Sequence, residues 1–305
     1  MISLRYHVVT IVAIFLALTI GLLAGSAFVQ PRLVDQLRSQ TDILRREIRA
    51  GEDKYADAQT ELDAFGGFVD AVAPSLTVGK LSGTSVVVVT QTGVEDAVLS
   101  QAQAALSNAG ANVLTTVSAT EELVSQDTAT QEQLATIVGE PTASADELPG
   151  LAAQALAHGL SPSTSVVGGD VLDQLLSAGF LAPVGAGPSQ AALEQVGQPG
   201  QVVIVLSGGR GEGDPVLSPD AFAVPLVESL STLNVPVAAG ESLQNDYDYV
   251  SILRGNGTDG TVTVDDLDHA MGGAALVLGL EDLIATGDGG AYGVKDGAAP
   301  LPPLP

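Results

Sequence analysis

The sequence predicts a mixed α/β protein in which a single N-terminal transmembrane helix is followed by a coiled coil and a Rossmann-like βα domain with a mainly parallel sheet. Three observations predict this: 22 uncharged residues at 8–29, a heptad repeat directly behind them, and valine-rich segments alternating with amphipathic ones after residue 80. We expect four parts: an N-terminal tail and transmembrane helix at 1–29, a coiled coil at 30–73, an acidic α/β domain at 80–295 and a disordered Ala/Pro-rich tail at 296–305.

The apolar segment is long enough to cross a bilayer. At about 1.5 Å of rise per residue, a helix of this length reaches about 33 Å, against a hydrocarbon core of about 30 Å. A cleaved signal peptide is the alternative, because Arg5 precedes the segment and the small residues 24–27 suit a signal peptidase. The segment exceeds the apolar core of a typical signal peptide, roughly 7–15 residues, which favours an uncleaved signal anchor.

The two flanks of this segment give opposing indications of orientation. More basic residues lie behind it than ahead of it, which by the positive-inside rule places the body in the cytoplasm. Against this, a short N-terminal tail ahead of an apolar segment is typical of a signal anchor that exports the rest of the chain, and the arginines alternate with acids. We expect a single-pass membrane protein whose C-terminal domain is extracytoplasmic, in the cell envelope.

A heptad repeat of apolar residues covers about forty residues behind the membrane segment. With Val34 at position a, the a and d positions are apolar except for Thr41 and Gly51 up to residue 72. The predicted seam is formed mainly by Val34, Leu37, Leu44, Ile48, Tyr55, Leu62 and Phe65. The alternative is a single amphipathic helix packed against its own domain.

Small residues recur every four positions inside the membrane segment, at Ala17, Gly21 and Gly25. This spacing lets two helix backbones approach closely. Together with the heptads, it predicts either a homo-oligomer of parallel chains or pairing with a partner's coiled coil in the envelope.

The region after residue 80 alternates between buried-type strands and amphipathic helices, an order that predicts βα units around a parallel sheet. We expect strands at 85–90, 112–117, 201–206 and 236–239. We expect helices at 94–109, 121–138, 147–157, 171–178, 219–233 and, as the last regular element, 266–283.

The composition excludes several classes of function. The chain has 11 Lys and Arg against 36 Asp and Glu, and eight of the basic residues lie before residue 81. The domain after residue 80 is therefore strongly acidic and repels phosphate backbones, so nucleic acid is not an expected partner. Solubility or raised salt explains this acidity more simply than a specific cation-binding role. Because the chain has no cysteine, disulfides and thiolate chemistry are excluded.

Catalytic and cofactor motifs are not evident, and we expect neither an enzyme nor a cofactor. The turn at 91–93 lacks the glycine spacing that a dinucleotide pyrophosphate needs. The loop at 207–214 comes after a strand and contains Arg210, so anion binding is one interpretation, but Pro215 comes next instead of a helix start and a flexible loop is favoured. With three isolated histidines, a catalytic triad is not supported.

The candidates for metal ligands are His269 and Met271, although residues two apart in a helix do not share a face. Asp265, Asp266 and Asp268 precede or open the last predicted helix, where capping is favoured over a hard-cation site.

Three blocks of sequence resemble one known family. They are the start at 1–25 with its Ser3-Leu4-Arg5-Tyr6-His7, the segment at 262–280 with its Asp265-Asp266-Leu267-Asp268, and Gly290-Ala291-Tyr292-Gly293. They resemble the actinobacterial copper transporter family, of the mycobacterial copper transport protein B (MctB) type. The resemblance implies an envelope protein with one membrane helix, associated with copper efflux or homeostasis, and makes copper a transported ion. SteB-like relatives are linked instead to envelope assembly and division with a membrane partner.

These observations support two hypotheses. The resemblance indicates an envelope component of copper efflux or homeostasis. The residues themselves favour a non-enzymatic coiled-coil tether or scaffold that recruits a partner for cell-envelope assembly or division. Copper(I) prefers thiolate and thioether ligands, which this chain almost lacks, and a lone helix cannot enclose a channel.

Overall fold

The computed structural model describes residues 4–27, 31–162, 168–185, 187–209, 217–257 and 260–303. The chain divides into two compact units, Met1–Gly66 and Gly67–Pro305. The first unit contains the apolar helix, and the second contains the sheet.

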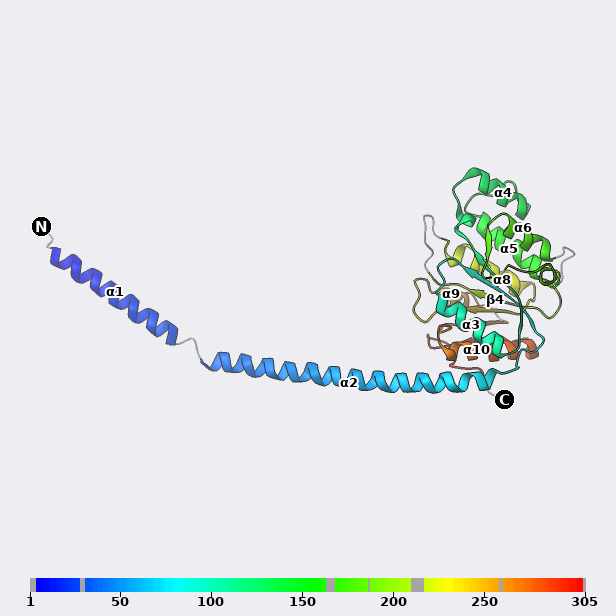
Figure 1. Ribbon diagram of the computed structural model, residues 1–305. Helices are drawn as coiled ribbons and strands as arrows, with labels where there is room; N and C mark the ends of the chain where they lie inside the picture. The colour runs from blue at the N-terminus through cyan, green and yellow to red at the C-terminus, as the bar shows by residue number, and fades with distance from the viewer. Residues whose placement is uncertain are drawn as a thin grey trace. The chain divides into compact units, whose positions relative to one another are not determined.

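The first unit is helical. It contains α1 (Leu4–Ala27) and most of α2 (Pro31–Thr77), a continuous helix of 47 residues (Figure 1). Within α1, the 20 residues Tyr6–Gly25 have a mean hydropathy of 2.6, so the helix is long and apolar enough to cross a membrane. The predicted coiled-coil region is thus one unbroken helix, and its pairing stays a prediction.

The second unit is built on a seven-stranded sheet in the order β3-β2-β1-β4-β5-β6-β7. The strands are β1 (Ser85–Gln91), β2 (Asn112–Ala119), β3 (Leu181–Pro183), β4 (Val202–Leu206), β5 (Val237–Gly240), β6 (Thr261–Val264) and β7 (Gly290–Tyr292). All neighbouring strands are parallel except β3, which pairs with β2 antiparallel. The predicted α/β class with a mainly parallel sheet is confirmed.

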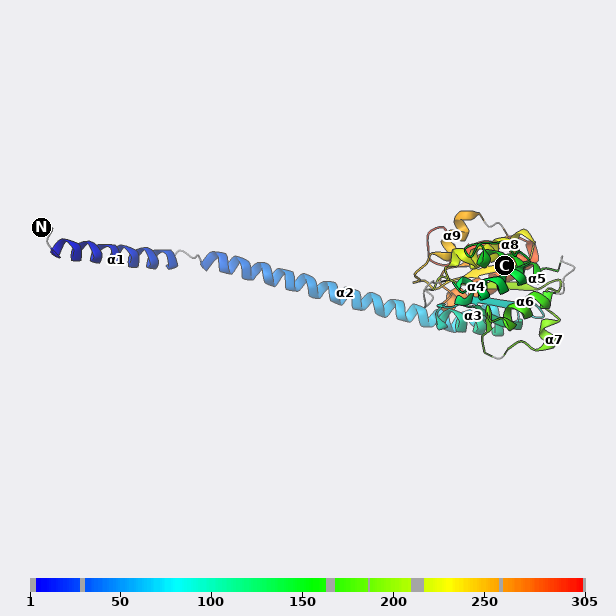
Figure 2. The same cartoon turned by 90° about the horizontal axis from the view of Figure 1, so that it is seen from above.

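Helices cover both faces of the sheet, which explains why its central strands are buried valine runs. The described helices of this unit are α3 (Asp96–Asn108), α4 (Thr128–Val138), α5 (Leu148–Leu160), α6 (Gly168–Ser177), α7 (Gln190–Leu193), α8 (Ala223–Thr232), α9 (Tyr249–Asn256) and α10 (Ala270–Thr286), with 3-10 turns η1 (Glu121–Val124) and η2 (Pro219–Ala221). One apolar core lies under α4, α5, α6, α8 and α9, and the other under α3 and α10 (Figures 1 and 2).

The end of α2 belongs to this second unit. The side-chain amide of Asn108 in α3 donates hydrogen bonds to the carbonyl oxygen of Pro74 and to the hydroxyl of Thr77, both at 2.8 Å. Gly79, two residues after the end of α2, has a φ of +72°, a left-handed conformation that suits glycine and does not continue the helix. The last turn of α2 is therefore fixed to the α/β domain.

Several local expectations are corrected. The helix expected at 121–138 is split, because Asp127 accepts a hydrogen bond from the backbone nitrogen of Thr130 at 3.0 Å and starts α4 anew. The helix expected at 266–283 begins at Ala270 instead, and β7 comes after it as a further regular element. The sequence does not predict the short elements β3, β6 and α9, since three to eight residues carry little periodicity.

The Ala/Pro-rich tail is also different from the expectation of disorder at 296–305. Over its described part, up to residue 303, the backbone of Ala299 donates to the carbonyl of Ala291 and accepts from the nitrogen of Gly293, both at 2.9 Å. Leu301 packs against the core beneath α3 and α10. This segment is ordered by backbone hydrogen bonds to the edge of the sheet, which its composition does not indicate.

Gly279 gives a test of this packing. A β-carbon at Gly279, inside α10, would lie 2.9 Å from both Tyr292 and Val262. We expect Gly279→Val to lower the free energy of unfolding by roughly 1–3 kcal/mol through overpacking, measured by denaturant unfolding of the full chain. Gly255→Val in α9, where a β-carbon meets nothing within 4 Å, is the matched control and should change stability little. Equal effects of the two substitutions would contradict the packing assigned to α10.

Candidate functional site

The strand order reverses between β1 and β4, the position at which open α/β sheets commonly bind ligands. Here the chain itself fills the crevice. A β-carbon on Gly209, after β4, would overlap the carbonyl group of Gly93, after β1. The buried Ser207 hydroxyl donates to the side-chain oxygen of Gln91. The loop residues 210–214, for which anion binding is one interpretation of the sequence, lie outside the described residues.

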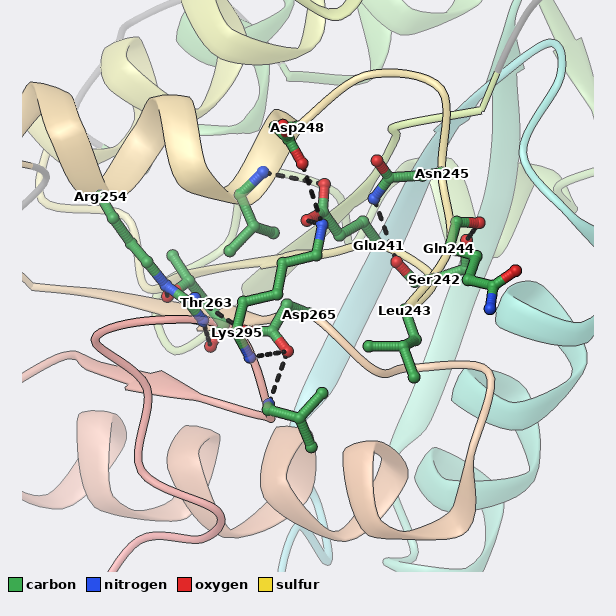
Figure 3. A network of polar contacts seen from close by, with 12 residues as sticks. Glu241, Ser242, Leu243, Gln244, Asn245, Asp248, Arg254, Thr263, Asp265 and Lys295 are labelled. Atoms are coloured by element: carbon green, nitrogen blue, oxygen red, sulfur yellow. Dashed lines mark hydrogen bonds and ion pairs between the residues drawn. The ribbon is translucent and has the colours of Figure 1, made fainter. Parts of the chain in front are cut away.

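A second polar cluster occupies the carboxyl ends of β5 and β6, shown in Figure 3. Glu241 comes directly after β5, and Asp265 and Asp266 come directly after β6. The exposed fractions of these three residues are 0%, 0% and 2%. Because buried carboxylates are costly unless they are paired, their partners decide what this cluster can do.

Asp265 is fully paired. Its Oδ2 accepts a hydrogen bond from Arg254 Nη1 at 2.7 Å, forming a buried ion pair. Its Oδ1 accepts from the backbone nitrogens of Val294 at 2.7 Å and Lys295 at 3.2 Å. Arg254 also donates to the hydroxyl of Thr263 at 3.0 Å. This one carboxylate therefore joins β6, α9 and the C-terminal segment.

Glu241 is paired with Lys295. The ammonium of Lys295 lies 2.8 Å from Glu241 Oε1 and 3.2 Å from Asp248 Oδ1, and the backbone nitrogen of Val250 donates to Glu241 Oε2 at 3.0 Å (Figure 3). Burial raises the pKa of Glu241, and the hydrogen bonds from Lys295 and Val250 offset this only in part. Burial opposes the charge of Lys295, yet Glu241 and then Asp248 outweigh it and raise the pKa of the ammonium.

Of the three buried carboxyl groups, that of Asp266 has no ion-pair partner, in the described part of the chain, of the kind that Glu241 and Asp265 have. Burial, and then the charge of Asp265, raise its pKa to about 6. Its Oδ1 is buried and has no hydrogen-bond partner among the described residues. The protonated form of Asp266 is therefore favoured in the folded chain more than in the unfolded one.

The aspartates at 265–268 are not helix caps, contrary to the expectation from the sequence. His269 is the residue before α10, and its side chain does not cap the helix. Asp268 Oδ1 instead accepts a hydrogen bond from the backbone nitrogen of Leu243 at 2.8 Å, bridging two loops. Strand ends, not a helix start, determine where these carboxylates lie.

The predicted metal ligands His269 and Met271 differ in environment. His269 is exposed, with its Nδ1 3.3 Å from Asp268 Oδ2, and Met271 is half-buried. Over the described ranges, no three His, Asp or Glu side chains are placed to share a metal ion. The assignment of these two residues as copper ligands stays a prediction.

Sequence reasoning missed Glu241 and Lys295, and it considered Arg254 beside clustered carboxylates only as a sign of an enzyme, without naming its partner. A usable signal existed, since Arg254 and Lys295 are two of the three basic residues after residue 80. Because acidic residues greatly outnumber basic ones in this domain, each basic side chain is expected to pair with a carboxylate. Which carboxylate it meets depends on strand order, which the residues alone do not reveal.

The predicted pairing residues of α1 line one groove. Ala17, Gly21 and Gly25 line this shallow groove together with Ile14, Leu18 and Leu22. A β-carbon on Gly21 or Gly25 would meet nothing within 4 Å, so the backbone is open to close approach along this side.

The predicted seam of α2 is exposed wherever its side chains are described. The exposed fractions are 57% for Leu44, 58% for Ile48, 73% for Tyr55, 64% for Leu62 and 61% for Phe65. The side chains of Val34 and Leu37 lie outside the described part. A row of large apolar side chains at heptad spacing thus has no cover within this chain over residues 44–65.

These features define a class of protein: an acidic α/β domain with closed polar clusters, carried on a long helix behind an apolar N-terminal helix. Over residues 1–303 the chain matches, and belongs to, the family described as copper transport outer membrane protein, MctB. It is 28% identical over 316 residues to the copper transporter MctB of Mycobacterium tuberculosis and to that of Mycobacterium bovis, covering 98% of each chain. The protein of the same name from Mycobacterium leprae is 26% identical over 323 residues, covering 99% of both chains.

Asp266 gives a pH-dependent prediction. Its folded pKa of about 6 lies above the unfolded value, so its contribution to stability is present at low pH and is lost as the pH rises through 6. We expect Asp266→Asn to raise the free energy of unfolding relative to the parent chain by on the order of 1 kcal/mol more at pH 7.5 than at pH 5. Denaturant titrations at the two pH values measure this difference, and a variant whose effect is the same at both would refute the assignment.

Proposed function

We propose that this chain is a membrane-anchored component of copper efflux or homeostasis in the cell envelope, with its α/β domain on the extracytoplasmic side. The observation that carries the proposal is the family match, which runs through α1, α2 and the α/β domain to residue 303. The 20-residue apolar span in α1 supports the anchor. The proposed function is non-enzymatic, and copper is the ion that the export assembly carries.

The chemistry of the domain favours an indirect part in copper handling. Copper(I) prefers sulfur ligands, and the chain has no cysteine and two methionines. The buried carboxylates Glu241 and Asp265 are already paired with Lys295 and Arg254. We therefore assign the chain a supporting role within an export assembly, with copper carried by other components.

A second candidate function, a coiled-coil tether or scaffold for envelope assembly or division, is favoured by the exposed seam of α2. Because each chain would be anchored in the membrane ahead of α2, the α2 helices of two such chains would pair in parallel. In a parallel pair of identical helices, Glu47 at position g faces Glu52 at position e of the other helix, a repulsive contact. Arg45 at position e faces the neutral Gln40. These charges favour a partner's coiled coil over a homo-oligomer.

Copper content tests the first function. Deleting the gene in its host should raise the copper content of cells grown at elevated copper, measured by elemental analysis, and the full-length chain should restore it. A chain that lacks residues 1–29 should not restore it, because it is not held at the membrane. Normal copper in the deletion strain, together with a division or envelope defect, would support the tether instead.

Paired isoleucines test the tether. Ile48 lies on the seam at position a and Ile43 lies off it at position c, and both are exposed, at 58% and 46%. We expect Ile48→Asp to abolish partner capture in cells and Ile43→Asp to leave it intact. Because the chain has no cysteine, Leu44→Cys gives a single crosslinking site that reports self-pairs and foreign partners separately. Equal capture by the two Asp variants would exclude the seam.

A further inference from the structure

A hollow of about 610 Å³ lies at the edge of the sheet, over β6 and β7. Its lining includes Arg254 of α9, Thr261 and Thr263 of β6, and two aspartates, Asp288 and Asp296, together with several glycines. The paired residues Glu241 and Lys295 are not part of this lining. The volume is in the range of sites that hold small molecules, roughly 300–1,000 Å³.

One buried hydroxyl at this hollow lacks a hydrogen-bond partner. Thr261 is 3% exposed, and its Oγ1 is buried without a partner among the described residues. The hydroxyl of Thr263 differs, because it accepts a hydrogen bond from Arg254 Nε at 3.0 Å and donates to the carbonyl oxygen of Gly290 at 3.4 Å. Since buried polar groups are almost always hydrogen-bonded, the Thr261 hydroxyl is available to a partner from outside the chain.

The alternation of side chains along β6 places this hydroxyl toward the hollow. Val262 and Val264 pack into the core under α3 and α10, so Thr261 and Thr263 lie on the opposite face of the sheet. On that face Thr263 meets Arg254, as Figure 3 shows, and Thr261 itself lines the hollow. The floor of the hollow therefore holds an unpaired hydroxyl beside one that is fully used.

The charge of the hollow favours a cation. Asp288 and Asp296 are both exposed, and neither forms an ion pair with a described residue. The positive charge of Arg254 is balanced by Asp265, at 2.7 Å. Two carboxylates are thus left without compensation in a domain that is acidic as a whole and attracts cations to its surface.

The rest of the lining is small and close to the backbone. Gly289 packs so tightly on Thr261 that a β-carbon there would overlap the Thr261 backbone, and Gly290 and Ala291 lie beside it in the lining. Such a surface suits short methylene chains between charged groups. A bare metal ion fits less well, because it would occupy little of this volume and no three described His, Asp or Glu side chains are placed to share one.

We propose that this hollow binds a linear aliphatic polyamine. Its ammonium groups donate hydrogen bonds to Asp288, Asp296 and the hydroxyl of Thr261, and its methylene groups lie against the glycines and Ala291. This site is independent of the proposed copper function, since none of its groups is a sulfur ligand.

Calorimetry with spermidine, on the full chain in a nonionic detergent, tests the site. We expect saturable binding of one spermidine per chain, and Asp288→Asn combined with Asp296→Asn should weaken it about tenfold or more, because two charge-assisted hydrogen bonds are lost. Asp170→Asn combined with Asp173→Asn makes the same change of charge on exposed positions of α6 and should weaken it little.

Two outcomes of this experiment would overturn the proposal. Equal weakening by the two pairs of substitutions would mean that spermidine is attracted by the acidic surface as a whole. Displacement of spermidine by CaCl2, but not by NaCl at matched ionic strength, would indicate a metal site instead.

Two buried threonines give a matched test of the hydroxyl. Thr115 Oγ1 in β2 is also buried without a described partner, but Thr115 does not line the hollow. We expect Thr261→Val and Thr115→Val each to raise the denaturant midpoint of the free chain, because each removes an unpaired buried hydroxyl at constant shape. Only Thr261→Val should weaken spermidine binding, by roughly two- to tenfold.

A Thr261→Val variant that binds spermidine as the parent does, or whose midpoint falls, would refute the role of this hydroxyl and with it the site. If Thr261→Val does not fold, the exposed aspartate variants decide.

Discussion

The domain depends on one buried carboxylate, Asp265. Its two oxygens accept hydrogen bonds from the guanidinium of Arg254 and from two backbone nitrogens of the C-terminal segment. Removing one partner of such a pair leaves a buried charge without compensation, which typically costs about 3–5 kcal/mol. The C-terminal half of the sheet is thus held by charge as well as by apolar packing. Backbone contact at Gly293 is close enough that a β-carbon there would overlap the Asp265 carboxylate.

Much of the architecture can be predicted from the sequence because its signals are local. Val86–Val89 are consecutive valines, a pattern typical of a strand that is buried on both faces. The apolar span of α1 is likewise evident from composition. The polar cluster could not be predicted in the same way. Glu241 and Lys295 are 54 residues apart in the chain, and they meet because β5, β6 and β7 are adjacent in the sheet. The sequence alone places the aspartates at 265–268 at a helix start, because β6 is only four residues long and gives no periodic signal.

The two proposed functions place different demands on the molecule. A supporting role in copper export needs the anchor and the domain in one chain, and the family match runs through both, over residues 1–303. A tether needs the seam of α2, whose large apolar residues are exposed along the helix. One molecule can satisfy both demands, since the seam and the polar cluster share no residue.

The pairing of Ala299 with the end of β7 has a consequence for self-association. An uncovered sheet edge is a template for adding strands from other molecules, and proteins commonly block it. Here the C-terminal segment covers one edge, and at the other edge β3 is three residues long and ends in Pro183, which lacks a backbone donor. The α/β domain is thereby protected against polymerisation through its sheet. Any ordered assembly is left to the helices α1 and α2.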